Sequence, residues 1–201
     1  MKDMPKLESP FKRVMDNNKS LVIPEINPGY EWVFDSLYTI CTEKLDGTNV
    51  SILMDGAEIR GLANRANRIS FSTLETNKYI DGVRLAYSKG RVEYGPGQYF
   101  GELMGPKIQK NFLKLEQPEW FPFSYLQKNA SYDSFDKYPK TFENLSSWLK
   151  NDIFSLVYRR LHGDIKPPEG VVFYNTKTGQ MAKLRRDMFD WYKGEYHNRE
   201  N

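Results

Sequence analysis

The chain is poor in the residues that form disulfides and metal clusters. Among 201 residues it has one cysteine, Cys41, and two histidines. A single cysteine excludes an intrachain disulfide, and this set is too small for a closed structural zinc site. Residues 1–6 also lack the apolar stretch of a secretory signal. We therefore expect a cytoplasmic protein that works in a reducing environment.

Several catalytic and membrane signatures are also missing. No apolar run approaches the length that spans a bilayer, so we expect no membrane segment. The sequence has no Walker-type phosphate loop, no His-Glu-x-x-His pair and no Gly-x-Ser-x-Gly elbow. Without that elbow, His162-Gly163-Asp164 is interpreted as a helix end. With a formal net charge of +3, the chain is too weakly basic to coat nucleic acid unspecifically, but a local basic face is compatible with this charge.

The chain shows a mixed pattern of strands and helices. Alternating apolar residues, β-formers and turn dipeptides predict two hairpins and further short strands, and apolar residues at helical spacing predict two helices. The second helix is expected to stop at Gly163 and the Pro167-Pro168 pair. The predicted strands are 38–43, 50–54, 57–63, 99–103, 120–125, 171–174 and 180–185, and the predicted helices are 72–88 and 145–161.

This pattern predicts an α+β fold with mostly antiparallel strands. The length fits one domain, and the sequence contains no internal repeat, low-complexity tract or clear linker. We therefore expect a single domain over residues 1–201, without an appended OB-fold or other C-terminal domain.

The tetrapeptide Lys44-Leu45-Asp46-Gly47 lies at a predicted strand-to-turn junction. Strand alternation would direct Lys44 and Asp46 to the same side, and Gly47 would permit a tight bend. Taken alone, the motif favours the simpler interpretation of an exposed lysine at a strand end, because short motifs occur often by chance.

Further short motifs follow in a set order, and the order favours function over chance. Each one alone also has a structural interpretation: Glu102 as an edge-strand charge, Glu169 as a turn cap, and the last basic pair as a solvated strand face. The motifs are Phe100-Gly101-Glu102-Leu103, the aromatic segment around Phe123, Glu169-Gly170-Val171-Val172 and Lys183-Leu184-Arg185.

In this order the motifs resemble those of the covalent nucleotidyltransferases, which include ATP- and NAD-dependent DNA ligases, RNA ligases and mRNA capping enzymes. The resemblance covers roughly residues 38–186. It is strongest to the phage-type RNA ligases that seal nicked duplex RNA, over residues 44–49 and over the stretch from Phe100 to Asn111. It implies an ATP-grasp-like ligase core, in which mostly antiparallel sheets flank a nucleotide cleft and helices lie outside.

The resemblance also implies a role for each motif residue. Lys44 is expected to be the nucleophile that takes AMP from ATP. Mg²⁺ or Mn²⁺ is expected at Glu169, with Asp46 as a second ligand. For the adenine-stacking ring we choose Phe123 over Phe121, and either ring could instead belong to the core. The expected nucleotide-binding residues are Glu43, Asn49, Arg65, Glu102, Phe123, Lys183 and Arg185.

One motif departs from the family pattern. The family usually ends its last motif with lysine, any residue, lysine, whereas this chain has Lys183-Leu184-Arg185. Arginine keeps the positive charge, but its planar fork differs in geometry from an ammonium group. The role of Arg185 is therefore open.

The chemistry explains why a lysine would need such neighbours. An amine attacks phosphorus only as the free base, yet an ordinary lysine with a pKa of about 10.4 is protonated at neutral pH. Desolvation and nearby cations such as Lys183, Arg185 and Arg65 favour the free base, and the same cations stabilise phosphoryl charge. We expect Lys44 to take AMP, pass it to a 5′-phosphate end, and allow a 3′-hydroxyl to expel it.

Two alternatives remain at this point. The first is another enzyme of the same superfamily, a DNA ligase or an mRNA-capping guanylyltransferase, with a different base pocket or acceptor. The second is a non-catalytic module with this fold that binds nucleic acid or nucleotide. The expected partner is nucleic acid with 5′-phosphate and 3′-hydroxyl ends, and RNA is expected over DNA. The sequence does not indicate whether an accessory protein takes part.

Overall fold

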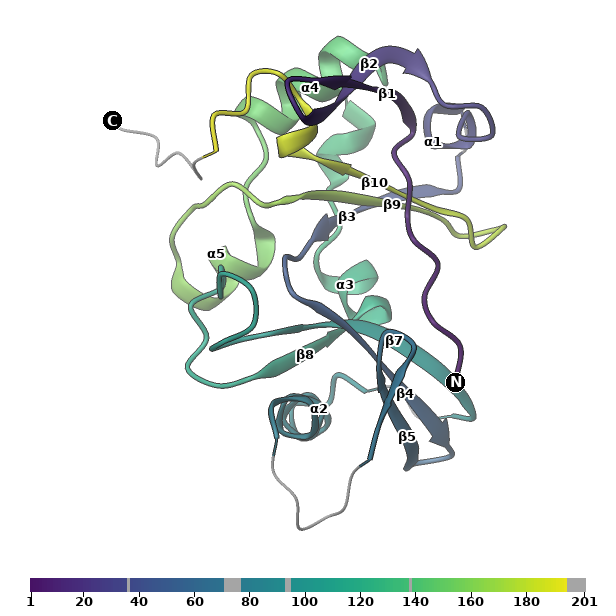
Figure 1. Ribbon diagram of the computed structural model, residues 1–201, viewed down its shortest axis with the longest axis vertical. Coiled ribbons are helices and arrows are strands. Elements are labelled where there is room, and N and C mark those ends of the chain that lie inside the picture. The colour runs from purple at the N-terminus through teal and green to yellow at the C-terminus, as the bar shows by residue number, and fades with distance from the viewer. Residues whose placement is uncertain (36, 71–76, 93–94, 138, 195–201) are drawn as a thin grey trace. The chain divides into compact units, whose positions relative to one another are not determined.

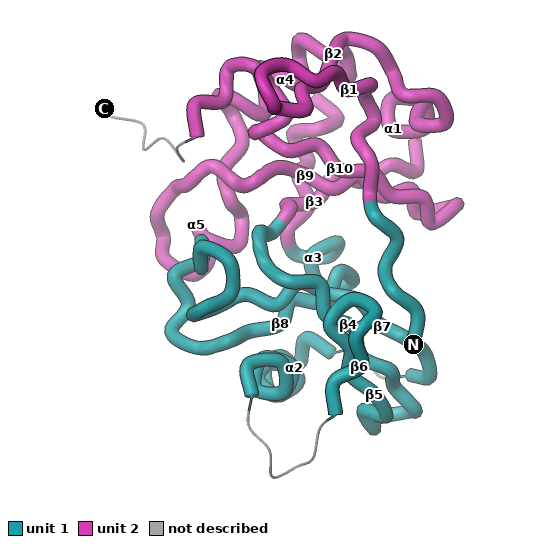
Figure 2. The backbone as a smooth tube through the Cα atoms, viewed as in Figure 1, with its two compact units in different colours: residues 1–6, 45–129 teal, residues 7–44, 130–201 magenta. Residues whose placement is uncertain are grey.

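The chain folds as two compact units, each built from two separate stretches of sequence (Figure 2). The first unit contains Met1–Lys6 and Leu45–Asn129, and the second contains Leu7–Lys44 and Ala130–Asn201. The computed structural model describes residues 1–35, 37–70, 77–92, 95–137 and 139–194.

The first unit is built on a five-stranded sheet in the order β6-β5-β4-β7-β8, with every neighbouring pair antiparallel (Figure 1). Helix α2 packs against β8, and its N-cap Asn77 accepts hydrogen bonds from the backbone N–H groups of Tyr79 and Ile80. The elements are β4 (Thr48–Asp55), β5 (Glu58–Asn64), β6 (Asn67–Ile69), α2 (Lys78–Ser88), β7 (Gly97–Met104), β8 (Glu119–Pro122) and α3 (Phe123–Asn129).

Strand β4 shows how alternation sorts the side chains of this sheet. Val50 and Ile52 are fully buried in the core of the first unit, where Leu103 and Trp120 join them. The indole Nε1–H of Trp120 donates to the carbonyl oxygen of Val50 at 3.1 Å. The core face therefore fixes the register of β4, and the intervening residue Ser51 belongs to the other face.

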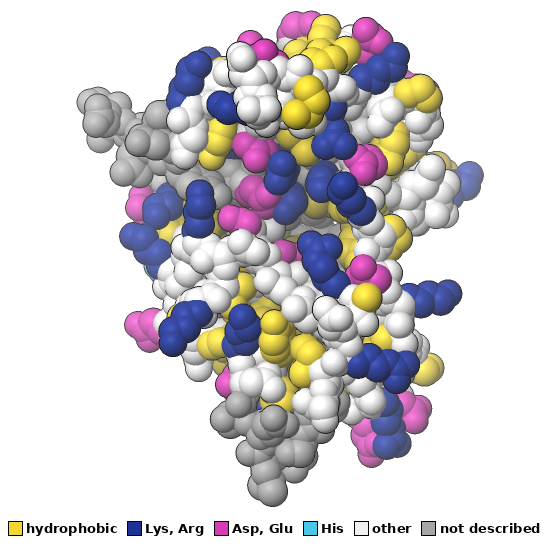
Figure 3. Space-filling model, viewed as in Figure 1, with side chains coloured by type: hydrophobic (Ala, Val, Ile, Leu, Met, Phe, Trp, Pro, Cys, Tyr) yellow, Lys and Arg dark blue, Asp and Glu magenta, His cyan; other side chains and the backbone are white. Residues whose placement is uncertain are grey.

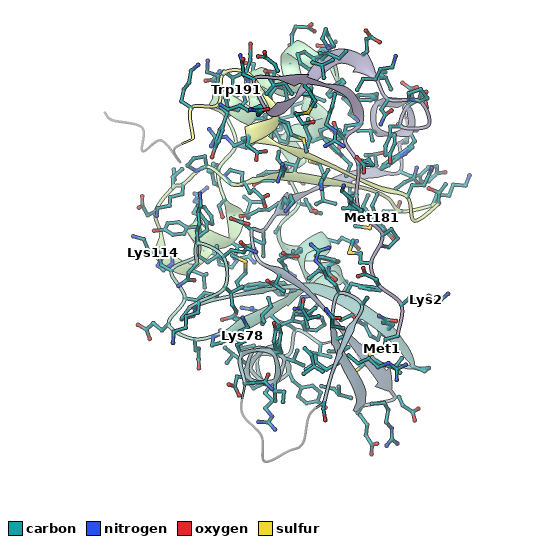
Figure 4. The ribbon with its side chains drawn as sticks, viewed as in Figure 1. Met1, Lys2, Lys78, Lys114, Met181 and Trp191 are labelled. Carbon is teal, nitrogen blue, oxygen red and sulfur yellow. The ribbon has the colours of Figure 1, made fainter. Side chains whose placement is uncertain are left out.

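The N-terminal segment of the first unit lies against β7. It includes Met1 and Lys2, which are labelled in Figure 4. The backbone N–H of Lys2 donates to Oε1 of Gln98 at 2.8 Å, and Nε2 of Gln98 donates back to the carbonyl oxygen of Lys2 at 2.7 Å. Gln98 also donates to Oγ of Ser51 at 2.9 Å, which ties the segment to β4.

The second unit contains a three-stranded antiparallel sheet in the order β10-β9-β3 and a separate hairpin, β1-β2. Its core gathers aromatic and aliphatic side chains such as Trp148, Phe173 and Leu184. The elements are β1 (Phe11–Asp16), β2 (Lys19–Ile26), α1 (Trp32–Asp35), β3 (Thr39–Lys44), η1 (Asp133–Lys137), α4 (Phe142–Asn151), α5 (Leu156–His162), β9 (Gly170–Asn175), β10 (Met181–Arg185) and η2 (Arg186–Met188).

Most predicted strands are confirmed, and so is the α+β class with antiparallel strands. The two predicted hairpins are β4-β5 and β9-β10. Gly163 ends α5 in the left-handed conformation, with a φ of 72°, so His162-Gly163 is a helix end as expected.

The single helix predicted over residues 145–161 is wrong. The structure has two helices, α4 and α5, which are separated by residues 152–155. Ser155 has extended backbone angles and caps α5, because its Oγ accepts the backbone N–H of Tyr158 at 3.0 Å. The apolar spacing continues across the break, since Ile153 and Val157 both stay buried, and periodicity alone therefore does not detect it.

Two further boundaries differ from the prediction. The strand predicted over residues 120–125 ends at Pro122, which has no N–H to continue the ladder, and Phe123 begins α3. The helix predicted over residues 72–88 begins at Lys78 after its N-cap Asn77, while residues 72–76 lie outside the described residues. Of the helices in the described ranges, none has the length and apolarity needed to cross a membrane.

Candidate active site

The three-stranded sheet of the second unit brings the predicted basic residues to one face. Lys44 at the end of β3 pairs with Gly170 on β9, and Gly170 pairs with Arg185 on β10. Lys183 precedes Arg185 by two residues, so both side chains belong to the same face of the sheet. The register thus gathers Lys44, Lys183 and Arg185, which lie far apart in the sequence.

The opposite face of this sheet is buried, and that burial holds the register. Cys41, Phe173 and Leu184 alternate with the face of the cations, and each is at most 2% exposed. A slip of one residue would move this apolar set to the other face. The basic residues are therefore held in place by the core beneath them.

Gly170 lies at the centre of the row that Lys44 and Arg185 flank. A Cβ atom at this position would lie 2.3 Å from the carbonyl oxygen of Leu184 and 2.6 Å from Cα of Arg185. Both are backbone atoms of β10 and cannot move aside cheaply. The close approach of β9 and β10 therefore requires glycine after Glu169.

Glu169 supplies the negative charge on this face. Its Oε2 lies 2.6 Å from Nζ of Lys44, and its Oε1 lies 3.9 Å from Nη1 of Arg185. The side chains of Glu169 and Lys44 are only 15% and 21% exposed, so water screens this pair less than it screens a surface ion pair. The backbone N–H of Arg186 donates to the carbonyl oxygen of Glu169 at 3.0 Å. One carboxylate is thus held between two of the predicted cations.

The electrostatics of Lys183 reflect this crowding of positive charge. Burial lowers the pKa of Lys183 below its ordinary value, and the charges of Arg185 and Lys44 lower it further. An anion that entered this face would relieve the repulsion among the three cations. The arrangement therefore suits a ligand with several negative charges, such as a polyphosphate.

Two further charged residues near Lys183 were not predicted. The backbone N–H of Lys183 donates to the carbonyl oxygen of Glu8 at 2.9 Å, and Nη2 of Arg13 lies 2.5 Å from Oε2 of Glu8. Both charges act on Lys183, where Glu8 opposes and Arg13 adds to the lowering of its pKa. No sequence pattern indicates them, because residues 7–13 carry no recognisable motif.

Glu43 is placed differently from the other predicted nucleotide-binding residues. It is 1% exposed and lies on the core face of β3. Its carboxylate accepts hydrogen bonds from Oγ of Ser155 and, at 2.9 Å, from the backbone N–H of Val157. Burial raises the pKa of Glu43 to about 7, against the smaller lowering effect of these hydrogen bonds. Glu43 therefore contacts the start of α5 and is not part of the basic face. Ser155, its partner, was also missed by the motif analysis.

Three predicted residues come together in the first unit. Asn49 on β4 pairs directly with Glu102 on β7, so their side chains share one face of the five-stranded sheet. Arg65 lies in the two-residue turn between β5 and β6, with a φ of 52°, and its backbone N–H donates to the carbonyl oxygen of Asn49 at 3.1 Å. The exposed side chain of Arg65 thus belongs to the same region as Asn49 and Glu102.

Asn49 carries a polar atom that the described residues leave unsatisfied. Its side chain is 8% exposed, and Nδ2 donates to Sδ of Met4 at 3.3 Å. In the described part of the chain, Oδ1 of Asn49 has no hydrogen-bond partner. A buried amide oxygen without a donor is costly, so a ligand donor at this position would be favourable.

Gly47 lies at a bend, as predicted, and it also provides close packing. It does not adopt a positive φ. A Cβ at Gly47 would lie 2.3 Å from the carbonyl oxygen of Leu103, and its backbone N–H donates to Oε1 of Glu102 at 3.1 Å. Strand β3 also ends at Lys44, so the alternation predicted to align Asp46 with Lys44 does not extend to Asp46, which is half-buried in the first unit.

The two candidate aromatic residues differ in burial. Phe121 pairs with Glu102 in the sheet but is 0% exposed, and the guanidinium of Arg91 lies 4.6 Å from its ring centroid. Phe123 is half-buried at the first position of α3. It does not lie in a strand as predicted, but more of its ring is open to a ligand.

The predicted residues therefore form two sets. The second unit holds Lys44, Glu169, Lys183 and Arg185, and the first holds Asn49, Arg65 and Glu102. Within the described ranges no group of three or more His, Cys, Asp or Glu side chains could hold a metal ion alone. A magnesium ion needs only one or two protein carboxylates when a phosphate ligand supplies further oxygens, and Glu169 fits that requirement as a hard oxygen donor.

Comparison with solved structures identifies chains of similar fold. One is a Naegleria gruberi RNA ligase mutant with ATP and Mn, with a TM-score of 0.54 and 16% identity, over 89% of this chain and 59% of that one. Another is the Naegleria gruberi RNA ligase with PPi, with a TM-score of 0.51 and 18% identity, over 73% of this chain and 49% of that one. At such identities the likeness shows the fold alone, and this chain spans only about half to three-fifths of the length of those chains.

Sequence comparison gives the family. A comparison with curated proteins finds no match. The family model described as RNA ligase matches residues 37–189, which include both sets of candidate residues. The resemblance inferred from the ordered motifs is thereby confirmed, and the chain belongs to the RNA ligase family.

Proposed function

We propose that the chain is an ATP-dependent RNA ligase that works through AMP covalently bound to Lys44. The observation that carries this proposal is the row of Lys44, Gly170 and Arg185 across three strands, with Lys183 on the same face and Oε2 of Glu169 2.6 Å from Nζ of Lys44. This arrangement joins a candidate nucleophile to cations that suit a triphosphate. Family membership supports the same function.

In the first step, Nζ of Lys44 attacks the α-phosphorus of ATP. A nitrogen–phosphorus bond forms, the bond from phosphorus to the bridging oxygen breaks, and pyrophosphate leaves with that electron pair. The proton lost from Nζ goes to solvent. Attack also needs a nitrogen lone pair, so Nζ first has to lose a proton to solvent and leave its ion pair with Glu169. Lys183 and Arg185 stabilise the negative charge on the phosphoryl oxygens.

The residues also fit the divalent cation that this chemistry uses. Glu169 would hold Mg²⁺ or Mn²⁺, and Asp46 is the second candidate ligand. When bound, the cation neutralises charge on the phosphate oxygens and on the leaving pyrophosphate. The Naegleria gruberi RNA ligase mutant with ATP and Mn supports this choice by analogy.

The residues of the first unit are proposed to bind the nucleoside part of ATP. Glu102 accepts hydrogen bonds from ribose hydroxyls, and Phe123 stacks on adenine. Asn49 and Arg65 contact the phosphate end, where the side-chain amide N–H of Asn49 and the guanidinium of Arg65 act as donors. We infer a nucleotide cleft of the ATP-grasp-like kind for these contacts. Glu43 acts indirectly, because its buried carboxylate holds β3 to the start of α5.

Two further steps complete the reaction. An oxygen of an RNA 5′-phosphate attacks the phosphorus of the lysyl-AMP, and the nitrogen–phosphorus bond breaks to return the amine of Lys44. A 3′-hydroxyl then attacks the 5′-phosphate, AMP leaves, and a phosphodiester forms. We propose nicked duplex RNA as the substrate, as in the phage-type ligases that the chain resembles.

Sealing of matched nicked duplexes tests this function. The full chain is incubated with Mg²⁺ and labelled ATP, GTP or NAD, and then with a nicked RNA duplex or a DNA duplex of the same sequence. Label transfer from ATP followed by sealing of the RNA nick supports the proposal. Label from GTP alone would indicate a capping guanylyltransferase, and sealing of DNA alone would indicate a DNA ligase. Absence of any label would favour a non-catalytic binding module.

A further inference from the structure

The loop between β7 and β8 combines buried anchors with exposed lysines. Ile108 is 2% exposed and Leu113 is 0% exposed, so both fix the loop to the first unit. Lys107, Lys110 and Lys114 are all exposed; Lys114 is labelled in Figure 4. We call residues 105–114 the lysine loop. Its sequence alternates residues that hold it to the core with residues that carry positive charge outward.

The backbone of the lysine loop is held in an unusual conformation. Lys107, Gln109, Asn111 and Lys114 have φ values of 60°, 45°, 45° and 50°, in the left-handed region that non-glycine residues rarely adopt. Such residues persist only where their surroundings fix them, and they gather at sites that bind ligands. Here Oδ1 of Asn111 accepts the backbone N–H of Leu115 at 3.1 Å, and Nδ2 of Asn111 donates to the carbonyl oxygen of Leu115 at 2.9 Å.

The lysine loop also offers donors that the protein does not use. Across the described ranges, Lys107, Lys110 and Lys114 form no ion pair. In the same part of the chain, the backbone N–H groups of Lys107, Gln109 and Lys110 donate no hydrogen bond. Backbone N–H groups in segments that enter the left-handed region repeatedly can form concave anion sites. The ammonium groups and the backbone donors therefore both suit the same kind of ligand, a phosphate.

Three other basic side chains of the first unit are already compensated by carboxylates. Lys89 and Arg91 both pair with the buried carboxylate of Glu119, and Arg60 pairs with Asp55 and Glu58. Figure 3 shows Lys and Arg side chains on the visible surface interspersed with Asp and Glu. The lysine loop differs because three positive charges occur within eight residues that contain no acidic residue. A nucleic-acid backbone carries regularly spaced phosphates, so several of its phosphates can contact the three lysines at once.

We propose that the lysine loop binds the phosphate backbone of the RNA substrate, an inference that rests on the proposed ligase function. The three lysines and the backbone donors supply affinity that does not depend on RNA sequence. The loop takes no part in the transfer of AMP to Lys44. Its loss therefore weakens RNA binding and sealing and leaves formation of the AMP adduct intact.

The experiment compares two triple variants of the full chain. The loop variant is Lys107→Gln, Lys110→Gln and Lys114→Gln. The control is Lys19→Gln, Lys137→Gln and Lys193→Gln, which removes the same charge from exposed positions of the second unit. Binding of a fluorescent nicked RNA duplex is measured by anisotropy without ATP over a range of KCl concentrations, and AMP-adduct formation is measured separately.

We expect the loop variant to bind RNA at least about tenfold more weakly than the parent, with a salt slope smaller by roughly 2 to 3, as three lost phosphate contacts require. The control should stay close to the parent, and a Lys→Arg triple at the loop should retain binding. Equal loss in the control, unchanged binding in the loop variant, or loss in the Lys→Arg triple would overturn the proposal.

Two arms separate this inference from its alternatives. Binding to phosphatidylserine vesicles is measured in parallel, and a loop variant that loses vesicle binding but keeps RNA binding would identify a membrane surface and overturn the RNA proposal. If the parent forms no AMP adduct, the proposed ligase function fails. The RNA-binding comparison still decides the role of the loop in that case, because it uses no ATP.

Discussion

Glu43 and Lys44 are neighbours in the sequence but lie on opposite faces of the same sheet. Glu43 is 1% exposed and binds Ser155 and Val157 at the start of α5, whereas Lys44 faces Glu169 with its Nζ 2.6 Å from Oε2. Strand alternation thus places Glu43 on the core face and Lys44 on the face that carries the cations. The buried carboxylate positions the end of β3, from which the candidate nucleophile projects.

The buried carboxylate makes stability depend on pH. The pKa of Glu43 is raised from 4.5 to about 7 in the folded chain, so folding favours its protonated form. Its stabilising contribution is fully present below about pH 4.5 and is lost as the pH rises through about 7. We expect Glu43→Gln, which stays neutral, to gain up to about 3 kcal/mol relative to the parent between pH 5 and pH 8. Urea unfolding at several pH values measures this.

The control for that experiment is Glu25→Gln, which removes an exposed carboxylate that pairs with Lys12. Its free energy of unfolding should follow that of the parent at each pH. Parallel curves for the parent and Glu43→Gln across this range would show that Glu43 does not titrate as the structure requires.

Ser155→Ala is expected to destabilise the chain more than an ordinary loss of a helix cap. Oγ of Ser155 accepts the backbone N–H of Tyr158 and donates to Glu43, and the residue is fully buried. We expect a loss of about 2 to 3 kcal/mol, against about 1 kcal/mol for Thr141→Ala at the exposed cap of α4. In a double-mutant cycle, Ser155→Ala and Glu43→Gln should be non-additive. Equal costs for the two caps, with additive double variants, would contradict the Ser155–Glu43 link.

Glu169→Gln should impair the reaction without disturbing the fold. It removes the charge that faces Lys44 and Arg185 and the candidate oxygen ligand for the divalent cation. We expect AMP-adduct formation to slow by about tenfold to a hundredfold, with a higher Mg²⁺ concentration needed for half-maximal rate. Asp187→Asn, which removes an exposed partner of the same Arg185, is the matched control and should be nearly silent. If Glu169→Gln needs the same Mg²⁺ concentration as the parent, Glu169 is not a ligand of the cation.

Gly170→Ala tests the close approach of β9 and β10. The added Cβ would meet backbone atoms of Leu184 and Arg185, so we expect a loss of about 1 to 3 kcal/mol or more in the free energy of unfolding. Gly61→Ala on β5 is the control, because its Cβ would meet Sδ of Met1 at the end of a flexible side chain. Urea unfolding of both variants measures the difference. If the two substitutions cost the same, the strand approach at Gly170 is not constrained as described.

The sequence predicted what local patterns encode. Alternation and turn residues predict both hairpins, and the order of the short motifs singles out Lys44, Glu102, Glu169 and Lys183 as candidate site residues. The gathering of Lys44, Lys183 and Arg185 on one face of the second unit's sheet follows from strand register, since Lys44 and Arg185 both align with Gly170. Once the pairing of the strands is known, the alternation of side chains along each strand determines which of them share a face.

The sequence did not reveal interactions between distant segments. Helical spacing continues through Ser155, whose Oγ caps α5 and also donates to Glu43, 112 residues away. The resemblance places Glu43 among the nucleotide-binding residues, whereas in the structure its partners bury it on the core face. The charges of Glu8 and Arg13 act on Lys183 because a backbone hydrogen bond from Lys183 to Glu8 joins segments that share no motif. Such contacts arise from tertiary packing and produce no periodic pattern in the sequence.

The mass of the intact chain after incubation with ATP and Mg²⁺ tests directly whether Lys44 is the nucleophile. We expect a mass increase of one AMP, mapped by peptide analysis to Lys44, and absent from a folded Lys44→Arg variant. The exposed-site variant Lys137→Arg should form the adduct like the parent. An adduct that persists in Lys44→Arg, or that maps to another residue, would contradict the assignment of Lys44 as the nucleophile.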